Sequence, residues 1–129
     1  MAASFAPEIP TLVLEPTERA PGIARRFVGA RFAGWGIADD HVGRLVVSEL
    51  VTNGLLHGAG PIVVRVYRDE RKGHPVIEVW DGGEGRPAVR SEDRGAEAGR
   101  GLVLLAATVR AWGVRPLNEG GKIIWAALY

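Results

Sequence analysis

Two polar residues interrupt the apolar side of a segment that is expected to be helical. At about 100° per residue, one stripe of this segment collects the apolar residues Val42, Leu45, Val46, Leu50 and Leu56. Glu49 and Asn53 lie one turn apart in the middle of that stripe, where a packing helix would carry Leu or Ala. Burying an amide without partners costs roughly 1 to 3 kcal/mol, and an unpaired carboxylate costs more. The pair therefore indicates a cavity that supplies water, metal or ligand. The alternatives are a satisfied buried network and a helix that is rotated further towards solvent.

A third polar residue, Asp81, ends a segment with the alternation of a β-strand. Period 2 places it on the same face as Ile77 and Val79, so a lone carboxylate ends an apolar row if that face is the core. The glycines that follow would let the backbone approach a flat ligand, or let the loop hinge. The alternative is an ordinary turn, because Asp-Gly is common turn chemistry.

Gly99, Arg100 and Gly101 open a strongly apolar segment. A helix that begins here would offer free N–H groups and a positive dipole, which suit phosphate. The alternative is the end of a flexible loop. The chain contains neither a phosphate-binding loop of the GxxxxGK[ST] type nor a dinucleotide-binding G-x-G-x-x-G fingerprint.

The segments between these residues predict alternating strands and helices. Apolar periodicity predicts strands over 11–14, 62–68, 75–80, 112–117 and 122–128, and helices over 17–32, from Asp39 or Asp40 to 57, and over 100–111. Gly58 is expected to end the second helix in a left-handed conformation. Paired strands of this kind favour a mostly antiparallel sheet with helices on one face. The core is expected to be anchored by Trp35, Trp80, Trp112 and Trp125, with a partner surface as the alternative for Trp35.

The composition bounds the class of protein. The chain has 129 residues, a formal charge of +1 and no cysteine. This length suits one domain: a flexible segment over 1–10 and a folded unit over 11–129. The balanced charge gives no electrostatic footprint for nucleic acid or an anionic membrane, and neither an export signal nor a membrane span is visible. The absence of cysteine excludes disulfides and cysteine zinc sites and fits a cytoplasmic location.

Taken together, the motifs resemble a known class of ATPase. VSELVTNGLLHG (47–58), VWDGGEG (79–85), GRGLVLLAATVRAWGV (99–114) and GGKIIWAAL (120–128) occur in the order found in the ATPase domain of gyrase-like, Hsp90-like, histidine-kinase and MutL proteins. The chain resembles most the stand-alone branch of anti-sigma factor serine kinases. The resemblance implies an α/β fold, a two-layer sandwich with a mixed, mostly antiparallel sheet of the Bergerat type. The nucleotide would lie between the helical layer and an ATP lid over about 82–99.

The resemblance also implies roles for single residues. Glu49 would be the general base for attack on the γ-phosphate, and Asn53 would hold Mg²⁺. Asp81 would accept a hydrogen bond from the adenine amino group, directly or through water. Gly83 would let the base approach the backbone, and Gly85 would begin the lid. The phosphates of ATP would be wrapped by Gly99, Arg100 and Gly101. Gly54 departs from the pattern, because the family usually has Ala after the Asn.

The expected function follows from this resemblance and from the length, which leaves a minimal ATP-binding domain that acts on another protein. The first hypothesis is a serine/threonine kinase that uses MgATP to phosphorylate an anti-sigma factor antagonist and sequesters a sigma factor. The alternative is a catalytically silent switch that binds a partner in an ATP-dependent manner. A structural domain without nucleotide is the third reading. No direct contact with nucleic acid or membrane is expected, and the branch suggests a homodimer through the first strand and helix.

Overall fold

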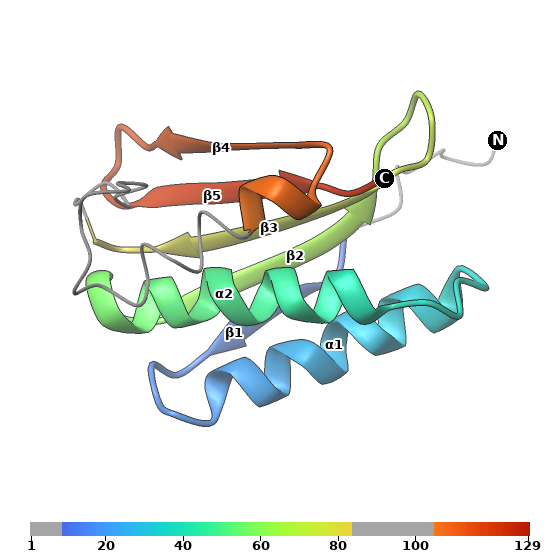
Figure 1. The fold of residues 1–129 in the computed structure, drawn as a ribbon. Helices are drawn as coiled ribbons and strands as arrows, with labels where there is room; N and C mark the ends of the chain where they lie inside the picture. The colour runs from blue at the N-terminus through green and yellow to red at the C-terminus, as the bar shows by residue number, and fades with distance from the viewer. Residues whose placement is uncertain (1–8, 84–104) are drawn as a thin grey trace, which may run out of the picture.

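The computed structural model describes residues 9–83 and 105–129, which form two layers (Figure 1). Along the chain the elements are β1 (Thr11–Leu14), α1 (Ala20–Gly34), α2 (His41–His57), β2 (Ile62–Arg68), β3 (Pro75–Asp81), β4 (Ala111–Pro116) and β5 (Lys122–Ala127). Residues 105–108 are also helical. Gly85, Gly99, Arg100 and Gly101, and most of the proposed lid, lie outside the described residues.

The strands form one sheet in the order β1-β2-β3-β5-β4. Every neighbouring pair in it is antiparallel, so the sheet is antiparallel throughout the part of the chain that the structure describes. Because β3 pairs with β5, Asp81 at the end of β3 lies opposite Lys122 at the start of β5. The structure confirms the predicted two-layer α/β sandwich.

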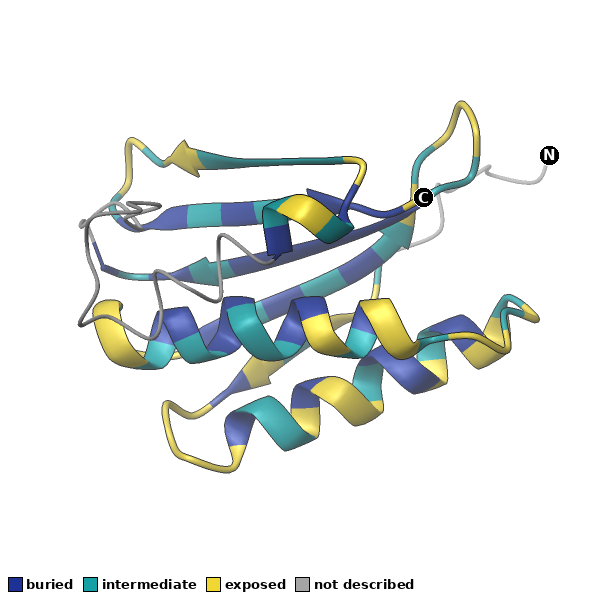
Figure 2. Cartoon of the chain, in the orientation of Figure 1, coloured by how far each residue is buried: buried dark blue, intermediate teal, exposed yellow. Residues whose placement is uncertain are grey.

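Helices α1 and α2 cover one face of the sheet, and the core lies between the two layers (Figure 2). Along each central strand, alternate residues point towards the helices, as the pleat requires. The residues of the central strands that are almost fully buried on this face are Ile62, Val64, Val66, Ile77, Val79, Ile124 and Ala126. No helix among the described residues is long and apolar enough to cross a membrane.

Helix α2 buries a different stripe from the one that its apolar residues predict. Val42, Leu45 and Leu56 are 37%, 42% and 60% exposed. The helix instead turns its small residues inward: a Cβ atom placed at Gly43 would lie 2.9 Å from the Phe32 ring, and one at Gly54 would lie 3.3 Å from Ile62. The close contacts at these glycines set the rotation of the helix. Packing is favourable wherever two surfaces fit closely, and not only where large apolar side chains are buried. The buried residues of α2 are Gly43, Val46, Val47, Leu50, Val51, Asn53 and Gly54.

Several helix ends differ from the sequence-based prediction. Helix α1 begins at Ala20, three residues later than predicted, with proline in its first turn, where a missing N–H costs nothing. Gly58 is extended (φ −95°, ψ −168°) and not left-handed. The last helix was predicted to reach 111, but its helical residues end at 108 because β4 starts at Ala111. Helix α1 ends at Gly34, two residues later than predicted, and Trp35 caps it before a left-handed Gly36 (φ 75°).

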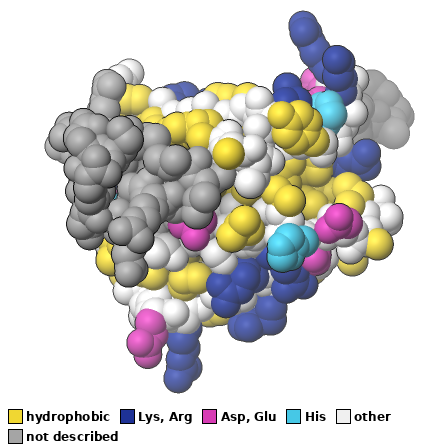
Figure 3. Space-filling view, viewed as in Figure 1, with side chains coloured by type: hydrophobic (Ala, Val, Ile, Leu, Met, Phe, Trp, Pro, Cys, Tyr) yellow, Lys and Arg dark blue, Asp and Glu magenta, His cyan; other side chains and the backbone are white. Residues whose placement is uncertain are grey.

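The two helices present basic side chains to solvent. Arg25 and Arg26 of α1 are exposed, and Figure 3 shows Lys and Arg side chains gathered over this helix, below α2. Arg25 Nη1 donates to Ser48 Oγ of α2 at 2.7 Å, which links the helices at their solvent edge. The chain as a whole stays nearly neutral, so this is a local feature of the helical layer.

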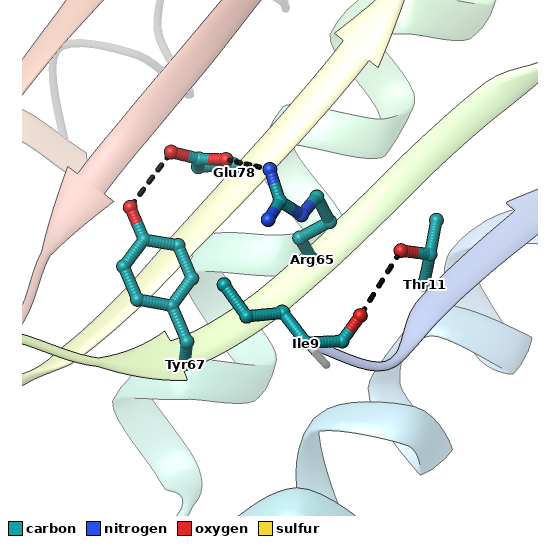
Figure 4. Close-up of polar contacts among 5 residues, drawn as sticks. All are labelled: Ile9, Thr11, Arg65, Tyr67 and Glu78. Carbon is teal, nitrogen blue, oxygen red and sulfur yellow. Dashed lines mark hydrogen bonds and ion pairs between the residues drawn. The ribbon is translucent and has the colours of Figure 1, made fainter. Parts of the chain in front are cut away.

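The opposite face of the sheet carries a polar cluster. Tyr67 Oη donates to Glu78 Oε2 at 2.7 Å, and Arg65 lies 3.5 Å from Glu78 Oε1 (Figure 4). By the alternation of their strands, Trp80 and Trp125 share this face with Glu78. These two tryptophans were predicted to anchor the core, and that prediction was wrong: both are only half-buried. The two tryptophans that do pack against the core are Trp35 and Trp112, and both are also half-buried.

Candidate functional site

Asn53 lies on the buried side of α2, one turn before the carboxyl end of the helix. Its side chain is 2% exposed, so the predicted inward orientation is confirmed even though the helix is rotated. Neither Oδ1 nor Nδ2 has a hydrogen-bond partner among the described residues. An amide can accept two hydrogen bonds and donate two, and buried amides are nearly always partnered. This unpartnered amide therefore indicates a polar ligand.

Asp81 ends β3 and points to the helical side of the sheet, as the alternation of Ile77 and Val79 predicts. It is 1% exposed. Its Oδ1 accepts the backbone N–H of Gly83 at 2.8 Å and the Nζ of Lys122 at 3.0 Å. Its Oδ2 is buried and has no partner within the described residues. The carboxylate is thus held on one oxygen and free on the other.

Lys122 is a member of this site that the sequence-based reasoning did not select. It is 2% exposed, and its Nζ contacts Asp81 Oδ1 and the carbonyl oxygen of Gly83, the latter at 3.4 Å. The ion pair offsets the cost of burying either charge alone. A signal was present in the sequence: period 2 places Lys122 on the same face as Ile124 and Ala126, where a charged residue is unexpected.

Glycines let the carboxyl end of α2 approach β3 closely. A Cβ atom placed at Gly58 would lie 2.7 Å from the Asp81 carboxyl carbon and 2.5 Å from the Gly54 carbonyl oxygen, distances that real Cβ atoms do not adopt. One placed at Gly83 would lie 2.7 Å from Gly58 Cα. The backbone N–H of Gly82 donates to the Ala59 carbonyl at 3.0 Å, which ties the end of β3 to the residues that follow α2. The Asn53 helix and the Asp81 strand therefore meet at one end of the molecule (Figure 1).

Glu49 lies one turn before Asn53 on α2 and is half-buried. It forms no ion pair within the described residues. A half-buried carboxylate of this kind can meet both a bound ligand and water. Asp81 and Gly83 are in direct contact, and the carboxyl end of the helix that carries Glu49 and Asn53 packs against them.

The donors and acceptors of the site suit a polar ligand better than a metal ion held by protein alone. No cluster of three His, Cys, Asp or Glu side chains that could hold a metal occurs in residues 9–83 and 105–129. In the part of the chain that the structure describes, the buried side-chain polar atoms without a partner are one acceptor on Asp81 and one acceptor and one donor group on Asn53. A single amide oxygen is a suitable ligand for Mg²⁺ when phosphate oxygens complete the coordination shell, because Mg²⁺ usually retains water and substrate phosphates as ligands. The residues present therefore fit a magnesium nucleotide.

Comparison with known proteins agrees with this arrangement. The family model described as the histidine kinase-like ATPase domain matches residues 14–128, which span nearly the whole chain and include both α2 and the end of β3. The search of curated proteins gave no match. The chain belongs to the histidine kinase-like ATPase domain family, and membership of this family implies ATP binding.

Proposed function

We propose that the protein is an ATP-binding regulator of the anti-sigma factor type, which binds MgATP between α2 and the end of β3. The observation that carries this proposal is the set of buried polar atoms on Asn53 and Asp81 that have no partner within residues 9–83 and 105–129. Leaving such groups unpaired costs free energy, and a ligand that supplies the missing partners recovers it. The family match over residues 14–128 supports ATP as that ligand.

Asp81 would recognise the base. Its Oδ2 is a buried acceptor, and the exocyclic amino group of adenine is a donor, so the two are complementary. Gly83, whose backbone N–H already contacts Oδ1, would leave room for the flat ring because it has no side chain.

Asn53 would serve the phosphate end of the nucleotide through Mg²⁺. When bound, Mg²⁺ offsets the negative charge of the phosphate oxygens. The amide oxygen would be the protein ligand, and its burial beside Leu50 and Val51 would hold it in place. Asn53 and Glu49 belong to the same regular helix and lie one turn apart. This spacing fixes the position of one side chain relative to the other.

Glu49 would act as the general base. Its carboxylate would take the proton from a serine or threonine hydroxyl of an antagonist protein while the hydroxyl oxygen bonds to the γ-phosphorus and the bond to ADP breaks. The phosphorylated antagonist would then lose its hold on this protein, and the nucleotide-bound domain would be free to sequester a sigma factor. A half-buried position suits this role, because the base must reach a hydroxyl that arrives from outside.

Calorimetric titration with MgATP tests the binding site. We expect saturable heat with the wild type and its loss in Asp81→Asn, because the amide can place a donor against the adenine amino group. Asp39→Asn is the matched control: Asp39 is exposed and only accepts the His41 N–H, which asparagine also accepts. No saturable heat with the wild type, or identical heat in Asp81→Asn, would contradict the proposed site.

A transfer assay tests the chemistry separately. With [γ-³²P]ATP and the antagonist protein, we expect phosphoserine or phosphothreonine on the antagonist. In Glu49→Gln the rate should fall by about 10² to 10⁴, while calorimetric affinity for MgATP stays near that of the wild type. Transfer that is absent from a wild type which binds MgATP would reject the kinase and leave the ATP-dependent binding switch. Unchanged transfer in Glu49→Gln would remove this residue from the mechanism.

A further inference from the structure

The buried ion pair at the start of β5 does more than balance charge. Asp81 Oδ1 has two donors, Gly83 N–H at 2.8 Å and Lys122 Nζ at 3.0 Å, while Oδ2 has none among the described residues. Both donors contact the same oxygen of the carboxylate. The arrangement is therefore asymmetric, with one oxygen occupied by the protein and the other left for a ligand.

We propose that Lys122 is a positioning residue that holds Asp81 with Oδ2 as its only available acceptor and thereby makes the site prefer a 6-aminopurine to a 6-oxopurine. The proposal rests on the proposed ATP site and deepens it. Lys122 itself would not touch the base. It would act through Asp81, to which it is tied by the register between β3 and β5.

The chemistry of the lysine explains why it can impose this orientation. An ammonium group only donates hydrogen bonds, and two of its contacts, to Asp81 Oδ1 and to the Gly83 carbonyl, are made within the site. Nearly complete burial of Lys122 and Asp81 keeps water from competing for either group. Without the ammonium group, a single backbone N–H would remain on the carboxylate, which could then turn away from the base, so that its attraction for a 6-amino group and its repulsion of a 6-oxo group would both weaken.

A fixed acceptor distinguishes purines by the group at position 6. ATP carries an amino group there and can donate to Oδ2, whereas ITP carries a carbonyl oxygen, so two acceptors would face each other. A buried polar group that is left unpaired discriminates strongly between such analogues. We therefore expect the wild type to bind MgATP about ten- to a hundredfold more tightly than MgITP.

The test measures both affinities by calorimetry for the wild type, Lys122→Met and Lys72→Met. Methionine is similar in length to lysine but has no charge or donor. Lys72 is the matched control, because it is the other lysine of the chain and is exposed in the turn between β2 and β3. We expect the ATP-to-ITP preference to fall at least about fivefold in Lys122→Met and to stay unchanged in Lys72→Met. If Lys122 only stabilises the fold, ATP and ITP weaken by the same factor, and that result overturns the proposal.

A second variant keeps the test decisive if Lys122→Met does not fold. In Asp81→Asn, Lys122 and the Gly83 N–H should both draw the amide oxygen inward, so that the NH₂ group takes the place of Oδ2. That variant should prefer MgITP to MgATP. The double variant Asp81→Asn/Lys122→Met also lacks the ammonium group of Lys122. Its preference for MgITP should therefore be weaker than that of Asp81→Asn. An Asp81→Asn variant that still prefers MgATP overturns the proposal.

The outcomes separate this inference from the proposed function. A wild type that binds neither nucleotide rejects the ATP site itself. A wild type that binds MgATP, with equal affinity for MgITP, keeps the ATP site and overturns the role of Lys122. An altered preference in Lys122→Met, or a reversed preference in Asp81→Asn that weakens when Lys122→Met is added, supports it when the circular dichroism spectra are like those of the wild type.

Discussion

Replacing Asn53 with alanine should stabilise the nucleotide-free protein and abolish its response to MgATP. The amide is 2% exposed and both of its polar atoms lack partners among the described residues. A site that is built to hold a ligand carries such a group at the expense of stability. The same substitution at an ordinary, hydrogen-bonded buried asparagine would destabilise the fold.

The size of the effect follows from opposing contributions. Removing an unpartnered buried amide recovers about 1 to 3 kcal/mol. The higher helix propensity of alanine adds about 0.5 kcal/mol. Lost packing of the amide carbon subtracts about 1 kcal/mol. The free energy of unfolding of Asn53→Ala should therefore exceed that of the wild type by about 0.5 to 2.5 kcal/mol.

Urea denaturation followed by circular dichroism measures this difference with and without MgATP. At a nucleotide concentration of about 100 times Kd, the wild type should gain about 2.7 kcal/mol and Asn53→Ala nothing, so the order of stability reverses. The control is Asn118→Ala: Asn118 is exposed in the turn before β5 and should change stability by less than about 0.5 kcal/mol. A clear loss of stability in nucleotide-free Asn53→Ala, or equal stabilisation of both proteins by MgATP, would refute the reasoning.

Two further predictions concern the close contact between Gly58 and Asp81, and the hydrogen bond between Tyr67 and Glu78 on the face of the sheet opposite the helices. Gly58→Ala should lower the free energy of unfolding by about 1 to 3 kcal/mol and weaken MgATP binding, because its Cβ would lie 2.7 Å from the Asp81 carboxyl carbon; Gly34→Ala, which meets nothing within 4 Å, should be neutral or stabilising in the same urea titration. Burial and the hydrogen bond to Glu78 raise the pKa of Tyr67 from 10.0 to about 12. Because the pKa is raised in the folded state, the stability from this group is complete below pH 10 and is lost as the pH rises to about 12. The tyrosinate absorbance difference between wild type and Tyr67→Phe should have its midpoint near pH 12, and a midpoint near the ordinary value would contradict the buried hydrogen bond.

Local pattern was sufficient to predict much of the strand structure. The alternation in β2 and β3 predicted their extents to within one residue, and it placed Asp81 on the core side because successive side chains in a strand must alternate. The extent of α2 to His57 was also predicted, because Gly58 follows the last apolar periodicity. The same pattern could not predict that Gly58 is extended, since its conformation depends on the contact with Asp81.

The sequence by itself determined that Asn53 and Asp81 face inward. Asn53 and Asp81 break apolar rows whose periods are 3.6 and 2, and these periods are properties of a single helix and a single strand. Only the tertiary structure decided which groups surround Asn53 and Asp81. The pairing of Asp81 with Lys122 depends on the register of two strands that lie 41 residues apart, and the rotation of α2 depends on close contacts at its glycines. Both are set by packing between elements, which no local period encodes.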